Sequence, residues 1–230
     1  MSRNKKSFEK ERNYAVEMRF SEKTKITSVK VDKGMISMMT DNIEVKPGSS
    51  AYIKFYEKGN GKEKKTLRIP LKSPNLYITE VLENTNLIIA VDTNVKNGKS
   101  ASVAAVFLVL KTHDSYEINF IKGYYNVFEN KTGLHSEVIA MDCLFKNIKA
   151  GVIACVLEND NVLVVTDHNL GKIEQFNRRE LPLIDGDDTS YLPDNVNLVY
   201  ASTDTKHDSV FNEMLAECDR CATELLKLKW

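Results

Sequence analysis

Two short apolar runs that each end in an aspartate constrain the fold of this chain more than any other feature. Leu87–Val91 is entirely apolar and is followed by Asp92, and Val162–Thr166 is followed in the same way by Asp167. Runs of this length, rich in branched aliphatic residues, are typical of buried strands. Either aspartate alone could simply begin a turn. Two acids in one crevice, however, would carry a high desolvation cost unless a cation paired with them. The runs therefore predict a divalent cation site.

The composition is that of an ordinary globular protein. The 230 residues suffice for one large core, or for a domain of about 150 residues with a smaller unit. Hydrophobic residues make up 42% of the chain, which places it outside the range of intrinsic disorder. Basic and acidic residues both number 32, so the net charge gives no overall argument for a nucleic-acid partner, although local basic patches stay possible.

Neither a membrane segment nor a disulfide framework is expected. No apolar run reaches about 18 residues, and the basic start is followed by the charged segment Phe8–Arg12, so we expect a cytoplasmic protein. The four cysteines are then predicted to be free thiols. Cys218 and Cys221 form a CxxC pair, but no second pair completes a zinc site. The pair also lies deep in a predicted helix, which favours packing over redox chemistry.

Residues 1–80 are predicted to form a β-rich N-terminal unit, and residues 81–230 a second domain. The boundary follows Pro70 and Pro74. Four strand-like segments separated by turn residues support the first unit: Ile26–Val31, Gly34–Met38, Ala51–Tyr56 and Thr66–Ile69.

The second domain is predicted to contain five strands and three helices. The predicted strands are Leu87–Asp92, Ser102–Leu110, Tyr116–Ile121, Val162–Thr166 and Val196–Ala201. The predicted helices are Ser136–Ile148, with Ser136 as N-cap, Leu170–Arg179 and Asp208–Lys227. Their order, βββαβαβα, predicts an α/β fold with a five-stranded mixed sheet and helices on its faces. Ligand sites in such sheets lie at the carboxyl ends of the parallel strands.

Further acids lie on the predicted helices. Glu137 shares a helical stripe with Met141 and Leu144, and a carboxylate on an apolar stripe is unusual. Its alternative role is to interact favourably with the positive end of the helix dipole. The last helix and the loop before it offer Asp204, Asp208 and Asp219. Only one of these need be a ligand, because Asp208 could cap the helix and Asp219 could be a surface ion-pair partner.

These segments resemble the ribonuclease H-like superfamily of nucleases over residues 86–230. Asp92 resembles the aspartate of the family's first strand, and Asp167 that of its fourth strand. His135–Ala140 resembles the start of the family's first helix, from which a glutamate, here Glu137, projects into the site. Asn212–Ala222 is similar to the last helix, and this match favours Asp219 over Asp208 as the fourth acid.

The resemblance implies a ribonuclease H-like nuclease that uses two Mg²⁺ or Mn²⁺ ions. Such ions prefer oxygen ligands and clamp the attacking and leaving oxygens of a phosphodiester. The expected metal ligands and catalytic residues are Asp92, Glu137, Asp167 and Asp219, with Asp208 or Asp204 as alternatives for the last. His207, or else His135 or His168, could assist proton transfer.

The expected partner is nucleic acid, and RNA, DNA and hybrid substrates all stay open, as does the oligomeric state. Lys172, Arg178 and Arg179 follow Asp167 and could contact phosphates, although a solvated helix face is the alternative. The rival function is a catalytically inactive domain of the same fold that acts as a binding or structural module.

Overall fold

The computed structural model describes residues 66–71, 76–151, 153, 156–157, 159–202 and 209–227. It also describes the backbones of five short strands: β1 (Asn13–Tyr14), β2 (Val16–Arg19), β3 (Val29–Lys30), β4 (Ile43–Val45) and β5 (Ile53–Tyr56). The predicted strand Gly34–Met38 lies outside the described residues. The predicted division at residue 80 stays a prediction.

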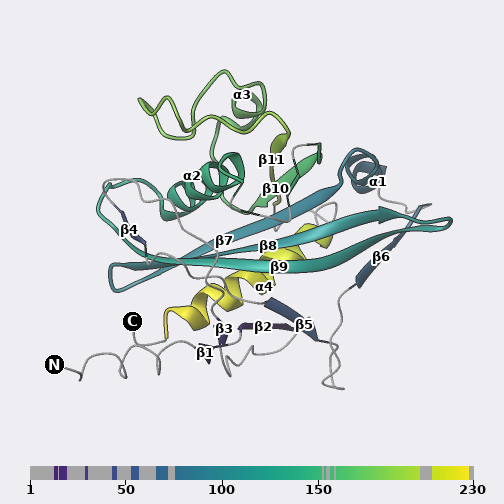
Figure 1. Cartoon of the computed structure of the whole chain (residues 1–230), viewed down its shortest axis with the longest axis horizontal. Coiled ribbons are helices and arrows are strands. Elements are labelled where there is room, and N and C mark those ends of the chain that lie inside the picture. The colour runs from purple at the N-terminus through teal and green to yellow at the C-terminus, as the bar shows by residue number, and fades with distance from the viewer. Residues whose placement is uncertain are drawn as a thin grey trace.

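A mixed, open β-sheet lies at the centre of the protein (Figure 1). Its long antiparallel strands are β7 (Leu87–Lys96), β8 (Lys99–Lys111) and β9 (Ser115–Asn130). The strands β10 (Val162–Thr166) and β11 (Val196–Tyr200) run parallel to β7, which gives the order β11-β10-β7-β8-β9-β4. The strand β6 (Thr66–Pro70) pairs with the first half of β9. The predicted α/β class with a mixed sheet is confirmed.

All three long strands extend beyond the predicted segments. The turn Asn97-Gly98 joins β7 to β8 with φ of 52° and 75°, as a tight hairpin requires, so both strands continue to this turn. The strand β9 was predicted to end at Ile121 but continues to Asn130. The register shifts opposite Val106 and Phe107, so a β-bulge absorbs Ile121 and restores the alternation.

Two helices cover opposite faces of the sheet (Figure 1): α2 (Ser136–Lys149) on one face and α4 (Ser209–Leu225) on the other. Successive residues of a strand point to opposite faces, so β7 supplies both cores. Ile88 and Ala90 pack in one cluster with Phe211 of α4, whereas Ile89 packs in the other with Met141 of α2. Both faces of β7 are therefore buried.

The helices differ from the predicted ones in three main respects. The helix α1 (Leu76–Glu83) was not predicted, and α3 (Ile173–Asn177) is shorter than the predicted segment. The positive φ of Gly171 and of Arg179 flank α3 and limit its length. The N-cap of α2 is His135 and not Ser136, because the Ser136 hydroxyl lies 2.8 Å from the Ser100 hydroxyl instead. None of the helices in the described part of the chain has the length and hydropathy that a membrane crossing requires.

Side chains near α3 cover the edge strand β11. The amide of Asn177 both accepts from the Leu198 N–H (2.7 Å) and donates to the Leu198 carbonyl (2.9 Å), as a neighbouring strand would. Arg179 donates to the carbonyl oxygens of Pro193, Asp194 and Val196. These contacts satisfy backbone groups that would otherwise be open to another strand.

Candidate metal centre

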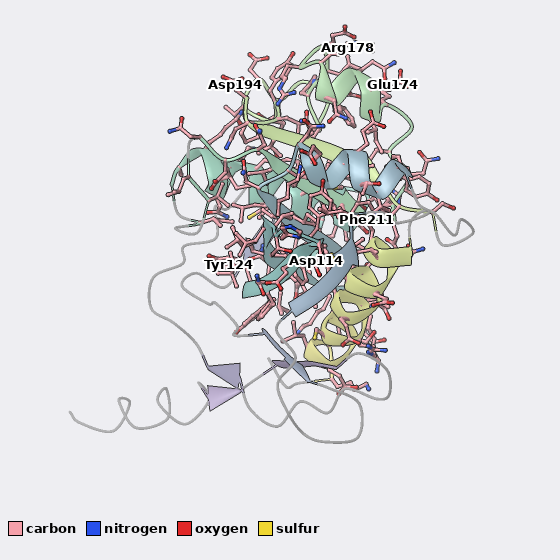
Figure 2. All side chains as sticks on the ribbon, turned by 90° about the vertical axis from the view of Figure 1, so that its right-hand side faces the viewer. Asp114, Tyr124, Glu174, Arg178, Asp194 and Phe211 are labelled. Atoms are coloured by element: carbon pink, nitrogen blue, oxygen red, sulfur yellow. The ribbon has the colours of Figure 1, made fainter. Side chains whose placement is uncertain are left out.

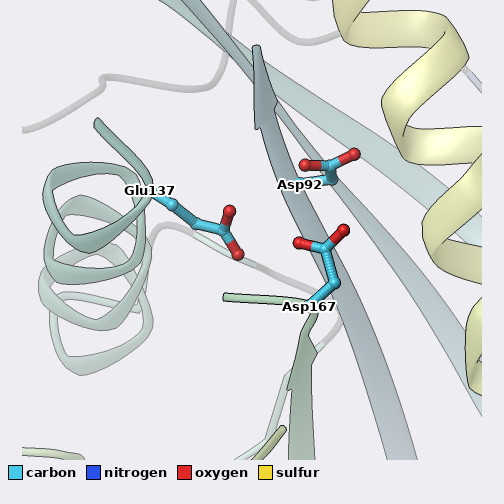
Figure 3. Close-up of side chains that lie close together, drawn as sticks. All are labelled: Asp92, Glu137 and Asp167. Atoms are coloured by element: carbon cyan, nitrogen blue, oxygen red, sulfur yellow. The ribbon is translucent and has the colours of Figure 1, made fainter. Parts of the chain in front are cut away.

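Three carboxylates converge at the carboxyl end of the parallel strands. Asp92, Glu137 and Asp167 each offer an oxygen, and these oxygens all lie within 4.8 Å of one another (Figure 3). Asp92 belongs to β7, Glu137 to the first turn of α2, and Asp167 directly follows β10. The structure thus brings together three of the four acids that were predicted as metal ligands.

The register of β7 and β10 explains why the two aspartates meet. The two strands are parallel, and Thr166 pairs with Val91. The next residue on each strand is an aspartate, and neighbouring strands are only about 4.8 Å apart. The similar positions of Asp92 and Asp167 in the two apolar runs therefore become adjacent positions in space.

Thr166 orients the third carboxylate. Glu137 is only 2% exposed, and its carboxylate accepts a hydrogen bond from the Thr166 hydroxyl. The same hydroxyl accepts from the backbone N–H of His168 over 2.9 Å. Thr166 was not predicted as a site residue. The signal for it was the single polar residue that ends an otherwise aliphatic strand.

The three acids carry more negative charge than their surroundings compensate. Burial, followed by the charges of Asp167 and Asp219, raises the pKa of Asp92 to about 7, although the Thr93 N–H donates to its carboxylate. Burial, with smaller effects from Asp92 and Asp167, raises the pKa of Glu137 to about 8. Burial also raises the pKa of Asp167. None of the ion pairs within the described residues involves these acids, so a cation at this point would be strongly favoured.

The fourth predicted acid, Asp219, lies beside this group but not within it. It is exposed on α4, and the side-chain amide of Asn94 donates to its Oδ1 over 2.7 Å and to its carbonyl oxygen over 3.0 Å. The same amide lies 2.9 Å from the Thr223 hydroxyl. The charge of Asp219 raises the pKa of both Asp92 and Asp167. The alternatives Asp204 and Asp208, and the predicted proton-transfer residue His207, lie outside the described residues.

Two histidines stack beside the carboxylates. The rings of His135 and His168 are nearly parallel, at 4°, with centroids 3.7 Å apart. His135 caps α2 two residues before Glu137, and His168 directly follows Asp167. Burial and the proximity of His135 lower the pKa of His168. The stack could not be anticipated from the sequence, where the two residues are 33 positions apart.

The structure does not bring all the predicted phosphate contacts to the site. Lys172 is exposed just before α3. Arg178 pairs with Glu180 through two contacts of 2.7 and 3.0 Å and lies at the outer end of the molecule (Figure 2). Arg179 binds carbonyls before and at Val196, which is the end of β11 opposite to Asp167.

The CxxC cysteines pack in the core. Cys218 and Cys221 are fully buried free thiols on the inner face of α4, and burial raises the pKa of both. The Cys218 thiol lies 3.4 Å from the carbonyl oxygen of Ala90. Their role in the described structure is to fill space between α4 and the sheet.

Comparison with known proteins assigns no family to the chain. No protein-family description, no curated protein and no solved structure matches it. The mixed α/β sheet with its acidic cluster is compatible with a ribonuclease H-like fold. That likeness rests on the residues and the geometry described above.

Proposed function

We propose that this protein is a divalent-metal-dependent nuclease, a phosphodiester hydrolase of the ribonuclease H-like type. The observation that carries the proposal is the convergence of Asp92, Glu137 and Asp167 from three separate elements on one point. Two of the three are buried, and this burial, with smaller effects from the neighbouring carboxylates, raises their pKa values. Perturbed carboxylates gathered at the end of a sheet are typical of functional sites.

The donor set fits Mg²⁺ or Mn²⁺. All three side chains offer carboxylate oxygens, which hard divalent cations prefer, and no thiol or imidazole is needed. Asp92, Glu137 and Asp167 would hold one ion, and Asp219 with Asp92 would hold a second. Two such ions, when bound, stabilise the charge on the attacking and leaving oxygens of a phosphodiester.

The protein's own residues would set the geometry of this site. Thr166 holds the Glu137 carboxylate, and Asn94 holds that of Asp219. Asp167 is exposed, so the site is open to solvent and to a large substrate on that side. The buried positions of Asp92 and Glu137 exclude water from the other side and strengthen electrostatic interactions with a bound phosphate.

The order of elements supports the family assignment within this proposal. From Leu87 onward the succession is β7-β8-β9-α2-β10-α3-β11-α4, which is the βββαβαβα order that the ribonuclease H-like resemblance implies. The three acids lie on β7, at the start of α2 and after β10, the positions that the resemblance assigns to them.

The alternative is a binding module of the same fold that does not catalyse hydrolysis. The position of Asp219 outside the three-carboxylate group favours it, because a site for only one ion would lack half of the two-metal arrangement. This alternative predicts binding of one ion and no hydrolysis of nucleic acid.

Calorimetric titration with Mg²⁺ and Mn²⁺, followed by incubation with labelled single-stranded, duplex and hybrid oligonucleotides, tests the proposal. We expect metal binding and metal-dependent cleavage, both lost in Asp92→Asn and Asp167→Asn and retained in Asp188→Asn. Asp188 is an exposed acid in the loop before β11 and serves as the matched control. Absence of binding at millimolar metal, with the protein folded, would defeat the proposal.

A further inference from the structure

The stacked rings of His135 and His168 present an aromatic surface at the rim of the carboxylate group. Their centroids are 3.7 Å apart and their planes differ by 4°. His135 is exposed, and the neighbouring Leu134 also keeps 38% of its surface exposed. His168 is half-buried, and one face of its ring is covered by the His135 ring. The His135 ring is therefore accessible to a ligand, and the stacked His168 ring supports it.

Each histidine is hydrogen-bonded to residues of the carboxylate group. The Nδ1 of His135 accepts from the Glu137 backbone N–H over 3.4 Å, and the backbone N–H of His168 donates to the Thr166 hydroxyl that binds Glu137. These hydrogen bonds connect the two histidines to Glu137, one of the proposed metal ligands. A ring held in this way loses little conformational freedom when a second planar group packs against it.

Both imidazoles lie close to the Asp167 carboxylate. The charges of His168 and His135 each oppose the rise in the pKa of Asp167 that its burial causes. A phosphate bound at the carboxylates would carry its sugar and base outward by only a few ångströms. The first turn of α2, with its positive dipole end, lies at the same place and favours a phosphate there.

We propose that the His135–His168 pair is a stacking subsite for an unpaired nucleobase, next to the phosphate that the three carboxylates would bind through metal. In a duplex, both faces of each base are covered by neighbouring bases, whereas a single strand can place a base on a protein ring. The inference rests on the proposed function and narrows its substrate class to single-stranded nucleic acid, including unpaired ends and loops.

Capping alone does not account for the histidine at position 135. Serine, aspartate and asparagine are the preferred N-cap residues, and Ser136 is used for other hydrogen bonds. The zero net charge also matters, because it leaves less phosphate attraction than a basic protein would have. Stacking, which every base can provide, would then supply a large share of the binding free energy.

Two substitutions separate the ring of His135 from its capping role. His135→Asn keeps a side-chain acceptor for the Glu137 N–H and removes the ring. His135→Phe keeps an aromatic ring and removes the acceptor. Affinity is measured by fluorescence anisotropy in Ca²⁺, an oxygen-binding cation that replaces Mg²⁺ so that the strands are not cleaved during the measurement. The probes are a labelled single-stranded deoxyadenylate dodecamer and a dodecamer of tetrahydrofuran abasic residues, which has the same backbone charge. Thermal melting and calorimetric metal titration of each variant report folding and metal binding.

For the adenylate strand we expect roughly tenfold weaker binding by His135→Asn, near-unchanged binding by His135→Phe, and metal affinity close to that of the unmodified chain in both. The abasic strand should bind all three proteins equally and more weakly. Two results would overturn the stacking subsite and leave the nuclease proposal standing. One is binding of the adenylate strand that is retained by His135→Asn but lost by His135→Phe. The other is an equal loss of affinity for the adenylate and abasic strands. A protein that binds metal but neither strand would overturn both.

Discussion

The side-chain amide of Asn94 on β7 donates to the Asp219 carboxylate on α4 over 2.7 Å, across 125 residues of sequence. Asn94 lies two residues after Asp92 on the same strand, so β7 supplies one proposed ligand and positions another. The contact also joins α4 to the sheet beside the carboxylates. This contact holds Asp219 beside the three-carboxylate group. The charge of Asp219 therefore raises the pKa of Asp92 and Asp167, although Asp219 is not a member of the group.

Asn94→Ala should release Asp219 and weaken the binding of a second metal ion. We also expect the free energy of unfolding to fall by about 1 kcal/mol, since a hydrogen bond between two elements is lost. Mn²⁺ titration followed by electron paramagnetic resonance counts the bound ions and gives the affinity of each. Thr223→Val is the matched control, because it removes another acceptor of the same amide and leaves Asp219 paired. Equal effects of both variants on metal binding would show that Asn94 does not act through Asp219.

Asp92→Asn should stabilise the metal-free protein while abolishing metal binding. At about pH 8 the Asp92 carboxylate is ionised in a buried position, which costs free energy in the folded state. The neutral side-chain amide of asparagine avoids this cost. A gain on the order of 2 kcal/mol is expected at about pH 8, with little change at about pH 4. Chemical denaturation at both pH values measures it. A loss of stability at the higher pH would mean that the carboxylate is compensated in the apo protein.

The metal-free protein should lose stability as the pH rises from about 4 to about 8. The folded pKa values of Asp92 and Glu137, about 7 and about 8, exceed their ordinary values of 3.8 and 4.5. The folded state therefore binds more protons than the unfolded state in this window, and stability falls with pH by up to about 1.4 kcal/mol per unit for each group.

Saturating Mg²⁺ should remove most of this slope and release protons on binding near pH 7. Denaturation series with and without Mg²⁺ show the slope, and calorimetry in buffers of different ionisation enthalpy counts the protons. A flat pH profile without metal, or binding without proton release, would contradict the raised pKa values.

Asp142 should be among the most sensitive positions outside the site. It is fully buried on α2, accepts from the Ser190 hydroxyl over 2.6 Å and lies 2.9 Å from the Lys146 ammonium. Lys146 also pairs with Asp187, so the network ties the loop before β11 to α2. Asp142→Ala should lower the free energy of unfolding by about 3 kcal/mol, and Ser190→Ala by about 1 kcal/mol, as measured by urea denaturation. A smaller decrease for Asp142→Ala than for Ser190→Ala would show that Asp142 is not the central member of this network.

Cys218 and Cys221 should resist thiol reagents in the native protein. Both are fully buried, and the raised pKa keeps them as thiols rather than reactive thiolates. Maleimide labelling followed by peptide mass spectrometry should find both unmodified under native conditions and modified in denaturant. Rapid native labelling of either residue would show that α4 detaches from the sheet.

The sequence by itself determined the elements from Leu87 onward, because hydrophobic periodicity is a local property. The strand Val162–Thr166 has the predicted bounds, and the helices α2 and α4 begin and end within a few residues of prediction. The two runs that end in Asp92 and Asp167 gave the site its first two members. The stripe that carries Glu137 and Met141 gave the third, since a carboxylate on an apolar face stands out in the sequence alone.

Only the tertiary structure decided how these elements complete the site. The β-bulge at Ile121 restores an alternation that breaks in the sequence, and the partners of Thr166, Asn94 and His168 come from distant segments. Such contacts depend on strand register and helix placement, which no local pattern encodes. The same holds for Arg179, whose hydrogen bonds at the far end of β11 give it a structural role that its position after Asp167 did not indicate.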